Sequence, residues 1–202
     1  MKLYYTTGTC STAPRILLAE AGIACEQESV SFKTRQTASG ADYLKINPNG
    51  YVPALQLDDG TILTEGPAID QYIADLAPAK KLAPANGTLE RYKLQSWLNY
   101  IGTELHKGGY SILFDRNAAA EWKDVARTTL AKRLAHADAT LADTPYLLGE
   151  DFGAADAYLY VVLSWSEHAG VDLAAFANLR AFIERVAARP SVQAVKAADA
   201  RK

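Results

Sequence analysis

The sequence predicts an α/β N-terminal half followed by an all-helical C-terminal half. Short β-like runs alternate with amphipathic helical segments through the first 76 residues, and beyond residue 88 no strand-like alternation occurs. The stretch from Ala77 to Gly87 is rich in Pro, Ala and Gly, which is typical of a linker. We therefore assign residues 1–78 to a first domain, 79–87 to a linker and 88–202 to an all-helical domain.

The elements of the first half follow in the order strand, helix, strand, helix, hairpin, helix, which gives four strands. Thr12 is expected to cap the first helix, Pro14 to lie in its first turn and Gly22 to end it. Asp59-Gly60 is a strong signal for a hairpin turn. The predicted strands are 3–5, 25–32, 52–57 and 61–64, and the predicted helices are 13–21, 41–46 and 67–76, with a polar loop at 33–40.

The second half contains only helical patterns. The segment 154–166 is apolar nearly all round, which predicts a helix buried on every side. At its start, Asp156 is expected to accept a hydrogen bond from the backbone N–H of Gly153, forming half of a capping box. The remaining predicted helices are 88–106, 119–142, 173–188 and 191–200.

The composition is that of an ordinary soluble protein. The chain has 202 residues, 49% hydrophobic and 22% charged, with a net charge of -2, so nothing indicates a nucleic-acid or membrane partner. Met1-Lys2 leads directly into a strand, without the apolar region of a signal peptide. We interpret Cys10 and Cys25, the two cysteines, as free thiols of a cytoplasmic protein.

Cys10 lies in a tight turn between the first strand and the first helix. Free backbone N–H groups and the positive end of a helix dipole are expected to converge there. That environment favours a thiolate, which is a nucleophile, a redox centre or part of a site for a small thiol. The alternative is a small buried cysteine that packs beneath a helix.

Val52-Pro53 opens the first hairpin strand. A cis peptide bond there exposes the backbone N–H and C=O of Val52, which could then pair with an extended peptide ligand. The alternative is a structural turn that binds nothing.

Glu65 and Gly66 lie at the start of the helix 67–76. A carboxylate beside a helix N–H suits a ligand with an α-amino acid end, because the two groups match an ammonium and a carboxylate. Alternatively, Glu65 only complements the dipole of its own helix.

His106 ends the helix 88–106, beside Lys107-Gly108-Gly109. An imidazole can donate a proton to a nearby thiol or accept one from it, although a lone histidine is more often structural. His136 and His168 have no cysteine or carboxylate at metal-ligand spacing, so we expect no metal site.

Taken together, these residues resemble the soluble glutathione transferases, and in particular the bacterial beta class. The resemblance runs over the whole length of the sequence. Within this class, the sequence is similar to members associated with aromatic and biphenyl degradation. The segments that carry the resemblance are residues 2–5, Cys10-Ser11, Thr37–Gly40, Asn47–Leu55, Leu63–Ile69, Leu82–Gly87, Glu104–His106 and Pro145–Gly149.

The resemblance implies a thioredoxin-like first domain, an all-α helical-bundle second domain and a homodimer. It also implies that glutathione binds between the domains. Cys10 matches the position near the glutathione sulfur, and Val52 matches the residue that pairs with the cysteinyl moiety before a cis proline. The family pattern also assigns glutathione contacts to Arg35, Glu65, Gly66, Asn99, Thr103, Glu104 and His106, of which Arg35 replaces a usual lysine and Gly66 a frequent serine.

The implied activity is transfer of the glutathione thiol to a small electrophilic substrate, aromatic or halogenated, with stabilising donors near Cys10, Ser11 and His106. A second interpretation makes Cys10 itself the reactive group of a thiol–disulfide transferase or reductive dehalogenase. A second glutathione would then resolve the mixed disulfide, because position 13 is alanine rather than cysteine. A third interpretation is a non-catalytic ligand-binding protein.

Overall fold

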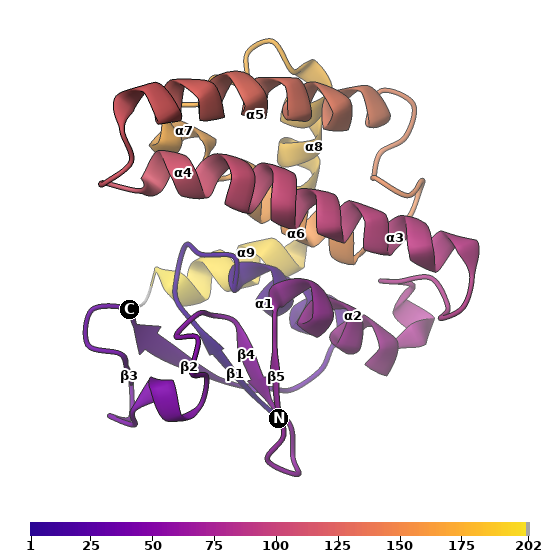
Figure 1. The fold of residues 1–202 in the computed structure, drawn as a ribbon. Coiled ribbons are helices and arrows are strands. Elements are labelled where there is room, and N and C mark those ends of the chain that lie inside the picture. The colour runs from indigo at the N-terminus through magenta and orange to yellow at the C-terminus, as the bar shows by residue number, and fades with distance from the viewer. Residues whose placement is uncertain (201–202) are drawn as a thin grey trace. The chain divides into compact units, whose positions relative to one another are not determined.

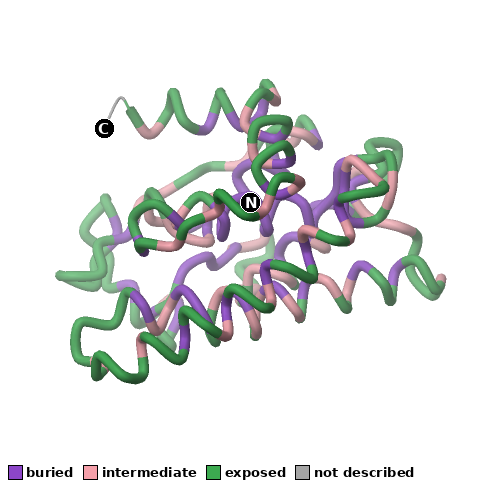
Figure 2. Tube along the Cα trace, turned by 90° about the horizontal axis from the view of Figure 1, so that it is seen from above, coloured by how far each residue is buried: buried purple, intermediate pink, exposed green. Residues whose placement is uncertain are grey.

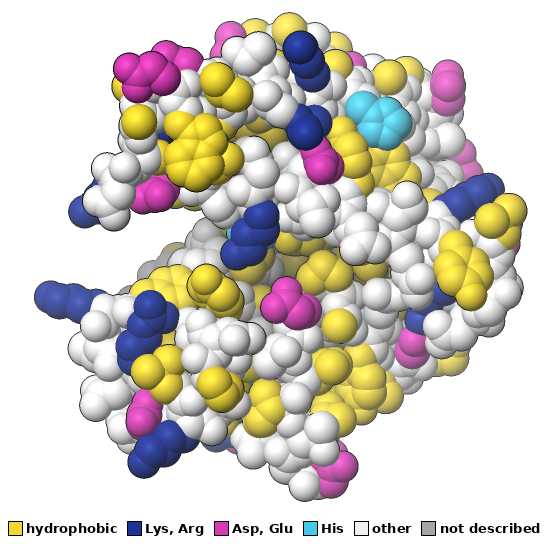
Figure 3. Space-filling view, viewed as in Figure 1, with side chains coloured by type: hydrophobic (Ala, Val, Ile, Leu, Met, Phe, Trp, Pro, Cys, Tyr) yellow, Lys and Arg dark blue, Asp and Glu magenta, His cyan; other side chains and the backbone are white. Residues whose placement is uncertain are grey.

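The computed structural model describes residues 1–200 and divides them into two compact units (Figure 1). Unit 1 comprises Met1–Leu82 and the last helix of the chain, and unit 2 comprises Ala83–Arg189. In the described residues, no helix is both long enough and apolar enough to cross a membrane. On the face drawn in Figure 3, basic and acidic side chains are interspersed rather than gathered by sign.

Unit 1 is built on a five-stranded mixed sheet in the order β3-β2-β1-β4-β5. The central strand β1 pairs in parallel with β2 and antiparallel with β4. The two-residue strand β3 lies within the predicted 33–40 loop and pairs antiparallel with β2, so the prediction of four strands missed one. The strands are β1 (Lys2–Tyr5), β2 (Glu26–Ser31), β3 (Gln36–Thr37), β4 (Ala54–Gln56) and β5 (Ile62–Thr64).

The strand β1 is buried on both faces of the sheet. Its successive side chains point to opposite faces, so Leu3 and Tyr5 share one face and Tyr4 lies on the other. Tyr4 packs in a cluster with Tyr43 and Val52, the residue before the proline. The helical segments of this part are α1 (Thr12–Ala21), η1 (Tyr43–Lys45), α2 (Gly66–Leu76) and η2 (Pro78–Lys80).

The helix α1 begins and ends on local signals. Gly22 ends it in the left-handed conformation (φ 68°), as predicted, because glycine has no Cβ to oppose a positive φ. The predicted cap at Thr12 is wrong. Ser11 occupies the N-cap position and its hydroxyl does not cap the helix, while Thr12 is the first helical residue and its buried Oγ1 has no partner in the described chain.

The last helix, α9 (Pro190–Asp199), packs against α1 and so belongs to unit 1. The sequence pattern had placed it in the helical half, because periodicity shows that a helix has an apolar face but not which surface covers that face. Here Ser191 donates to Glu20 at 2.5 Å, and Asp199 is paired with the buried Arg15.

Unit 2 consists of helices around α6, in which every residue is buried. Figure 2 shows buried and exposed residues alternating along the other helices, the pattern of helices that pack by one face. As predicted, Asp156 accepts from the backbone N–H of Gly153 at 2.9 Å, and it also accepts from that of Leu147. The helices are α3 (Leu89–Tyr100), η3 (Ile101–Tyr110), α4 (Ser111–Phe114), α5 (Ala120–Thr140), α6 (Ala154–Leu163), α7 (Ser166–Ala169) and α8 (Ala177–Ala187).

The segment η3 is a π-helix that joins α3 to α4. The predicted end of this helix near His106 is therefore wrong, because Gly108 and Gly109 do not interrupt it. A Cβ on Gly108 would lie 2.7 Å from the carbonyl oxygen of Thr103, closer than real Cβ contacts. Glycine is thus needed at position 108 because the wider helical turn leaves no room for a Cβ, and it does not end the helix.

Candidate active site

The turn that carries Cys10 is held in place by hydrogen bonds between its own residues. The backbone N–H of Thr6 donates to Ser11 Oγ at 3.0 Å, and this hydroxyl donates to the carbonyl oxygen of Thr6 at 3.1 Å. Thr9 Oγ1 lies 2.7 Å from the same Ser11 Oγ and donates to the same carbonyl. Ser11 is completely buried, so its hydroxyl is occupied in holding the turn.

The start of α1 offers fewer free donors than the sequence predicted. The N–H of Thr12 donates to the carbonyl of Thr9, that of Ala13 donates to Cys10, and Pro14 has none. The expectation of several free N–H groups around Cys10 is therefore wrong, although the positive end of the helix dipole remains. A donor for a bound thiolate must be found elsewhere.

Cys10 and Val52 meet across 42 residues of sequence. The Cys10 thiol donates to the carbonyl oxygen of Val52 at 3.3 Å, and the peptide bond between Val52 and Pro53 is cis. The backbone N–H of Val52 donates to no acceptor within residues 1–200. The thiol thus lies beside a backbone segment that still has a donor to offer an extended ligand.

Glu65 adopts a strained backbone conformation directly before α2. Its φ is +67°, which is uncommon for a residue with a side chain. Its exposed carboxylate and the backbone N–H of Gly66 have no partners in the described part of the chain. Strain of this kind is often found at ligand sites, and these two groups are complementary to the charged ends of an α-amino acid.

Arg35 also adopts a positive φ, 56°, and reaches the loop that precedes Val52. Its Nη1 donates to the carbonyl oxygen of Gly50 at 2.8 Å. Gly50 has a φ of 68°, and a Cβ there would lie 3.0 Å from that same nitrogen. The guanidinium is therefore held close to the loop while its other N–H groups keep their donor capacity.

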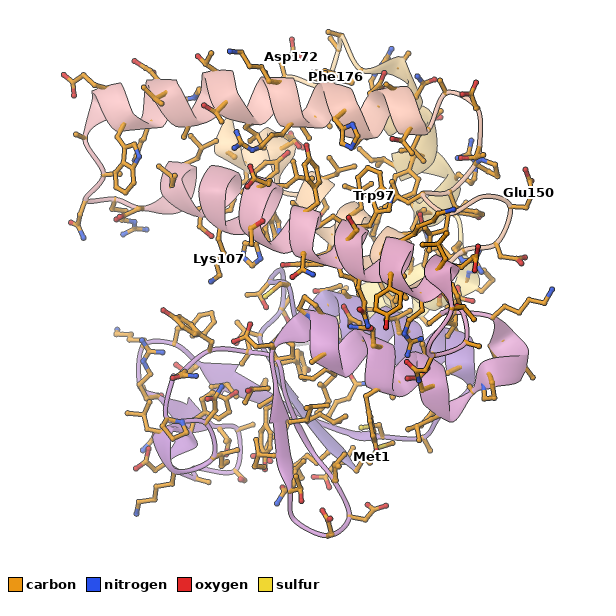
Figure 4. All side chains as sticks on the ribbon, turned by 45° about the vertical axis from the view of Figure 1, so that its right-hand side comes forward. Met1, Trp97, Lys107, Glu150, Asp172 and Phe176 are labelled. Carbon is orange, nitrogen blue, oxygen red and sulfur yellow. The ribbon has the colours of Figure 1, made fainter. Side chains whose placement is uncertain are left out.

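In unit 2, His106 lies in η3 among aromatic rings from α6 and the residues that follow it. Its Nδ1 is 2.7 Å from the Tyr158 hydroxyl, and its ring meets that of Trp165 edge-on at 4.9 Å. Burial, with Lys107 next in the chain (Figure 4), lowers the pKa of His106 to about 4. The imidazole is therefore neutral at pH 7.

The side chains of Asn99, Thr103 and Glu104 already have partners in the same unit. Asn99 donates to the carbonyl of residue 95 and Thr103 to that of Asn99, each one turn earlier in the helix. Glu104 forms an ion pair with Arg133 of α5. Asn99 lies in α3, and Thr103 and Glu104 lie in η3 with His106, but none of these contacts joins their side chains to His106.

The other two histidines contact aromatic rings. Trp97, labelled in Figure 4, stacks on His136 at 5.2 Å, and His168 lies against Phe114. Within residues 1–200, no three histidine, cysteine, aspartate or glutamate side chains come together as a metal site would require.

Comparison with known protein families decides which family the chain belongs to. Residues 1–75 match the model of the glutathione S-transferase N-terminal domain, and residues 100–190 match that of the C-terminal domain. The chain is a member of the glutathione S-transferase family.

Its relatives include bacterial transferases that match it from end to end. Glutathione S-transferase GstA of Escherichia coli O157:H7 is 43% identical over 202 residues, which cover 100% of both chains. The solved ternary complex of BphK, a bacterial transferase, has a TM-score of 0.97 at 52% identity and covers 99% and 100% of the two chains. The bacterial beta-class transferase of Sphingomonas chungbukensis has a TM-score of 0.93 at 45% identity, with 98% of each chain covered.

The chain is therefore a transferase of the bacterial beta class, with a thioredoxin-like domain followed by a helical domain. Sequence reasoning missed both aromatic residues that contact His106 in this glutathione transferase, Tyr158 and Trp165. For Tyr158, the only available signal was a tyrosine in an otherwise apolar helix, since a buried tyrosine hydroxyl usually needs a hydrogen-bond partner.

Proposed function

We propose that this transferase conjugates the thiol of glutathione to a small electrophilic substrate, and that unit 1 binds the tripeptide. The observation that carries the proposal is the 3.3 Å contact between the Cys10 thiol and the Val52 carbonyl oxygen. It places the thiol beside the backbone N–H of Val52, which has no acceptor in the described residues. The cysteinyl part of glutathione pairs with the backbone of Val52, so its sulfur lies near Cys10.

The γ-glutamyl end of glutathione supplies an ammonium and a carboxylate. In this proposal, the unpartnered Glu65 carboxylate binds the ammonium, and the N–H of Gly66 at the start of α2 binds the carboxylate. Arg35, held by Gly50, contributes positive charge toward the glycyl carboxylate. All these groups come from unit 1.

His106 is proposed to be the catalytic residue of unit 2, acting as a hydrogen-bond donor to the glutathione sulfur. Donors in the Cys10 turn are largely occupied, so a neutral imidazole is the better candidate to favour the thiolate. Asn99 of α3 and Thr103 and Glu104 of η3 are proposed to support glutathione binding. Trp165 meets the His106 ring and packs against Phe114, which is 39% exposed, and this apolar surface supports an aromatic or halogenated electrophile.

A second function is favoured by the state of Cys10 itself, which forms no disulfide and is partly exposed. In this case its thiolate attacks the glutathione sulfur of a mixed disulfide between glutathione and a small substrate thiol, so that Cys10 becomes disulfide-bonded to glutathione and the substrate thiol leaves. A second glutathione then attacks that disulfide, which releases glutathione disulfide and restores the cysteine.

The assembly and surroundings of the enzyme complete the proposal. We propose a homodimer, in which exposed apolar side chains such as Tyr51, Leu89 and Tyr92, all over 60% exposed, are candidates for the interface. The proposed compartment is the cytoplasm, where both cysteines stay reduced, and the reaction uses no metal. Sedimentation equilibrium tests the dimer directly.

The two chemistries are separated by steady-state turnover of glutathione with an activated haloaromatic. The parent is compared with Cys10→Ala and with the matched control Cys25→Ala, and mass spectrometry detects glutathione adducts. Conjugation that persists in Cys10→Ala supports bound glutathione as the nucleophile. Activity that disappears only in Cys10→Ala, with an adduct on Cys10 in the parent, overturns the main proposal in favour of the second.

A further inference from the structure

Tyr158 is the hydroxyl partner of His106. Both residues belong to unit 2, where His106 lies in the π-helix η3 and Tyr158 in the buried helix α6. Their atoms Nδ1 and Oη are 2.7 Å apart, the distance of a strong hydrogen bond. Within the part of the chain that the structure describes, this is the one hydrogen bond of the imidazole ring, and Nε2 has no partner.

Both partners are held firmly in place. Tyr158 is only 4% exposed and lies two residues after Asp156, whose carboxylate is fixed by the N–H groups of Gly153 and Leu147. Trp165 also meets the imidazole edge-on, with ring centroids 4.9 Å apart. The ring of His106 is therefore held by a hydrogen bond on one nitrogen and by an edge-on contact with an aromatic ring.

A neutral imidazole carries its proton on only one nitrogen, and the hydrogen bond at the other nitrogen decides which. A phenol is a stronger acid than a neutral imidazole N–H, and an imidazole nitrogen is a better acceptor than a phenol oxygen. The favoured arrangement is thus O–H of Tyr158 donating to Nδ1, which leaves the proton of the ring on Nε2.

We infer that Tyr158 is a positioning residue that fixes His106 in the tautomer with the proton on Nε2, so that Nε2–H is a permanent donor. This inference rests on the proposed function for its purpose, since that donor is the one offered to the glutathione sulfur. It assigns His106 the role of stabilising a thiolate by donation, rather than removing the thiol proton as a base. The thiol proton accordingly leaves to solvent, and no proton is transferred to the ring.

The first test measures the tautomer in the protein without glutathione. Long-range ¹H–¹⁵N correlation spectra distinguish protonated from unprotonated ring nitrogens, and the spectrum of His106→Asn identifies the His106 signals among the three histidines. At about pH 7 we expect Nε2 protonated and Nδ1 unprotonated in the parent. In Tyr158→Phe, which keeps the ring and loses the hydroxyl, we expect a mixture of both tautomers.

The second test is kinetic, with Tyr100→Phe as the matched control. Tyr100 also donates its hydroxyl within unit 2, to the carbonyl of Arg133, but contacts His136 instead of His106. Tyr158→Phe is expected to lower kcat for conjugation by about tenfold with a smaller change in the KM for glutathione, whereas Tyr100→Phe leaves both near the parent values. Thermal melts verify that both variants are folded.

The outcomes separate this inference from the proposed function. A protonated Nδ1 in the parent, or an unchanged tautomer and kcat in Tyr158→Phe, overturns the role of Tyr158. If the parent shows the expected tautomer but no conjugation, the proposed conjugation fails while the assignment of the hydrogen bond stands.

Discussion

Arg15 and Asp199 form an ion pair between the first and last helices of the chain. Nη1 of Arg15 lies 2.8 Å from Asp199 Oδ1, although 184 residues separate them. Arg15 is only 2% exposed, and its other contacts are Gln27 Oε1 at 2.8 Å and the ring of Tyr5 at 4.2 Å. Asp199 thus neutralises a guanidinium that is buried within unit 1.

Removing that carboxylate should destabilise the protein. We expect Asp199→Ala to lower the free energy of unfolding by about 2 kcal/mol, below the usual loss of about 3–5 kcal/mol because Gln27 and Tyr5 still contact the guanidinium. The control is Asp124→Ala, which breaks a pair with Arg127 between two largely exposed side chains and should change stability by less than about 0.5 kcal/mol. Urea denaturation measures the free energy of unfolding of both variants. Equal losses would show that the buried ion pair stabilises the protein no more than the exposed one.

Asp70 should make stability depend on pH. It lies in α2, is completely buried, and neither carboxylate oxygen has a partner in the described residues, so burial raises its pKa well above 3.8. As pH rises above about 4, the unfolded state loses this proton while the folded state retains it. The folded state is therefore progressively disfavoured, by about 1.4 kcal/mol per pH unit, until the pH reaches the raised pKa.

The measurement for Asp70 compares unfolding free energies of the parent and Asp70→Asn between pH 4 and pH 8. The amide has nearly the same shape and does not titrate, so the variant should match the parent at the acid end and become more stable than it as pH rises. The exposed Asp143→Asn is the control and should show no such divergence. A difference that is independent of pH would mean that Asp70 is already ionised in the folded protein.

Position 66 should tolerate a side chain that improves glutathione binding. A Cβ on Gly66 would meet Pro53 at 3.8 Å, an ordinary van der Waals distance, and its φ is not positive. The hydroxyl of Gly66→Ser adds a donor for the glutamyl carboxylate, so we expect the KM for glutathione to fall by about threefold or more. Gly66→Ala adds the same Cβ without the hydroxyl and should leave KM nearly unchanged. A KM that rises in both variants would place the glutamyl end elsewhere.

Two glycines of the same π-helix should respond oppositely to alanine. At Gly108 the new Cβ would lie 2.7 Å from the Thr103 carbonyl, while at Gly102 its nearest neighbour would be Tyr158 Oη at 3.8 Å. Glycine to alanine in a helix normally stabilises by up to about 1 kcal/mol, which we expect at Gly102. At Gly108 we expect a loss of about 1–3 kcal/mol as η3 readjusts. Thermal unfolding tests both, and stabilisation by Gly108→Ala would show that the π-helix converts to α-helix without cost.

The sequence predicted those features that depend on neighbouring residues. Gly22 ends α1 because a left-handed residue is needed there, and Asp156 reaches the N–H of Gly153 only three residues away. The same reasoning found Cys10 and Val52 as separate candidates. It could not show that they meet at 3.3 Å, because that contact depends on strand order, with β1 placed beside β4.

The wrong predictions have a common physical cause. Each depends on a contact that the pattern of neighbouring residues in the sequence does not reveal. Thr12 was a plausible cap, but the turn uses Ser11 and Thr9 to satisfy Thr6, so the helix starts one residue earlier. The helix was predicted to end at residue 106, whereas it continues through η3, where Gly108 makes room for a carbonyl oxygen. Tyr158 gave little signal because its role depends on a histidine 52 residues away.

The packing of α9 on α1 also affects how the protein forms during synthesis. A ribosome makes the first 82 residues early, but the helix that completes their unit follows only after the whole of unit 2. Domains generally fold in order from the N-terminus as they emerge. Here Arg15 lacks its partner Asp199 until the whole of unit 2 has been made, so unit 2, made as one uninterrupted segment, can complete its own structure before unit 1 does.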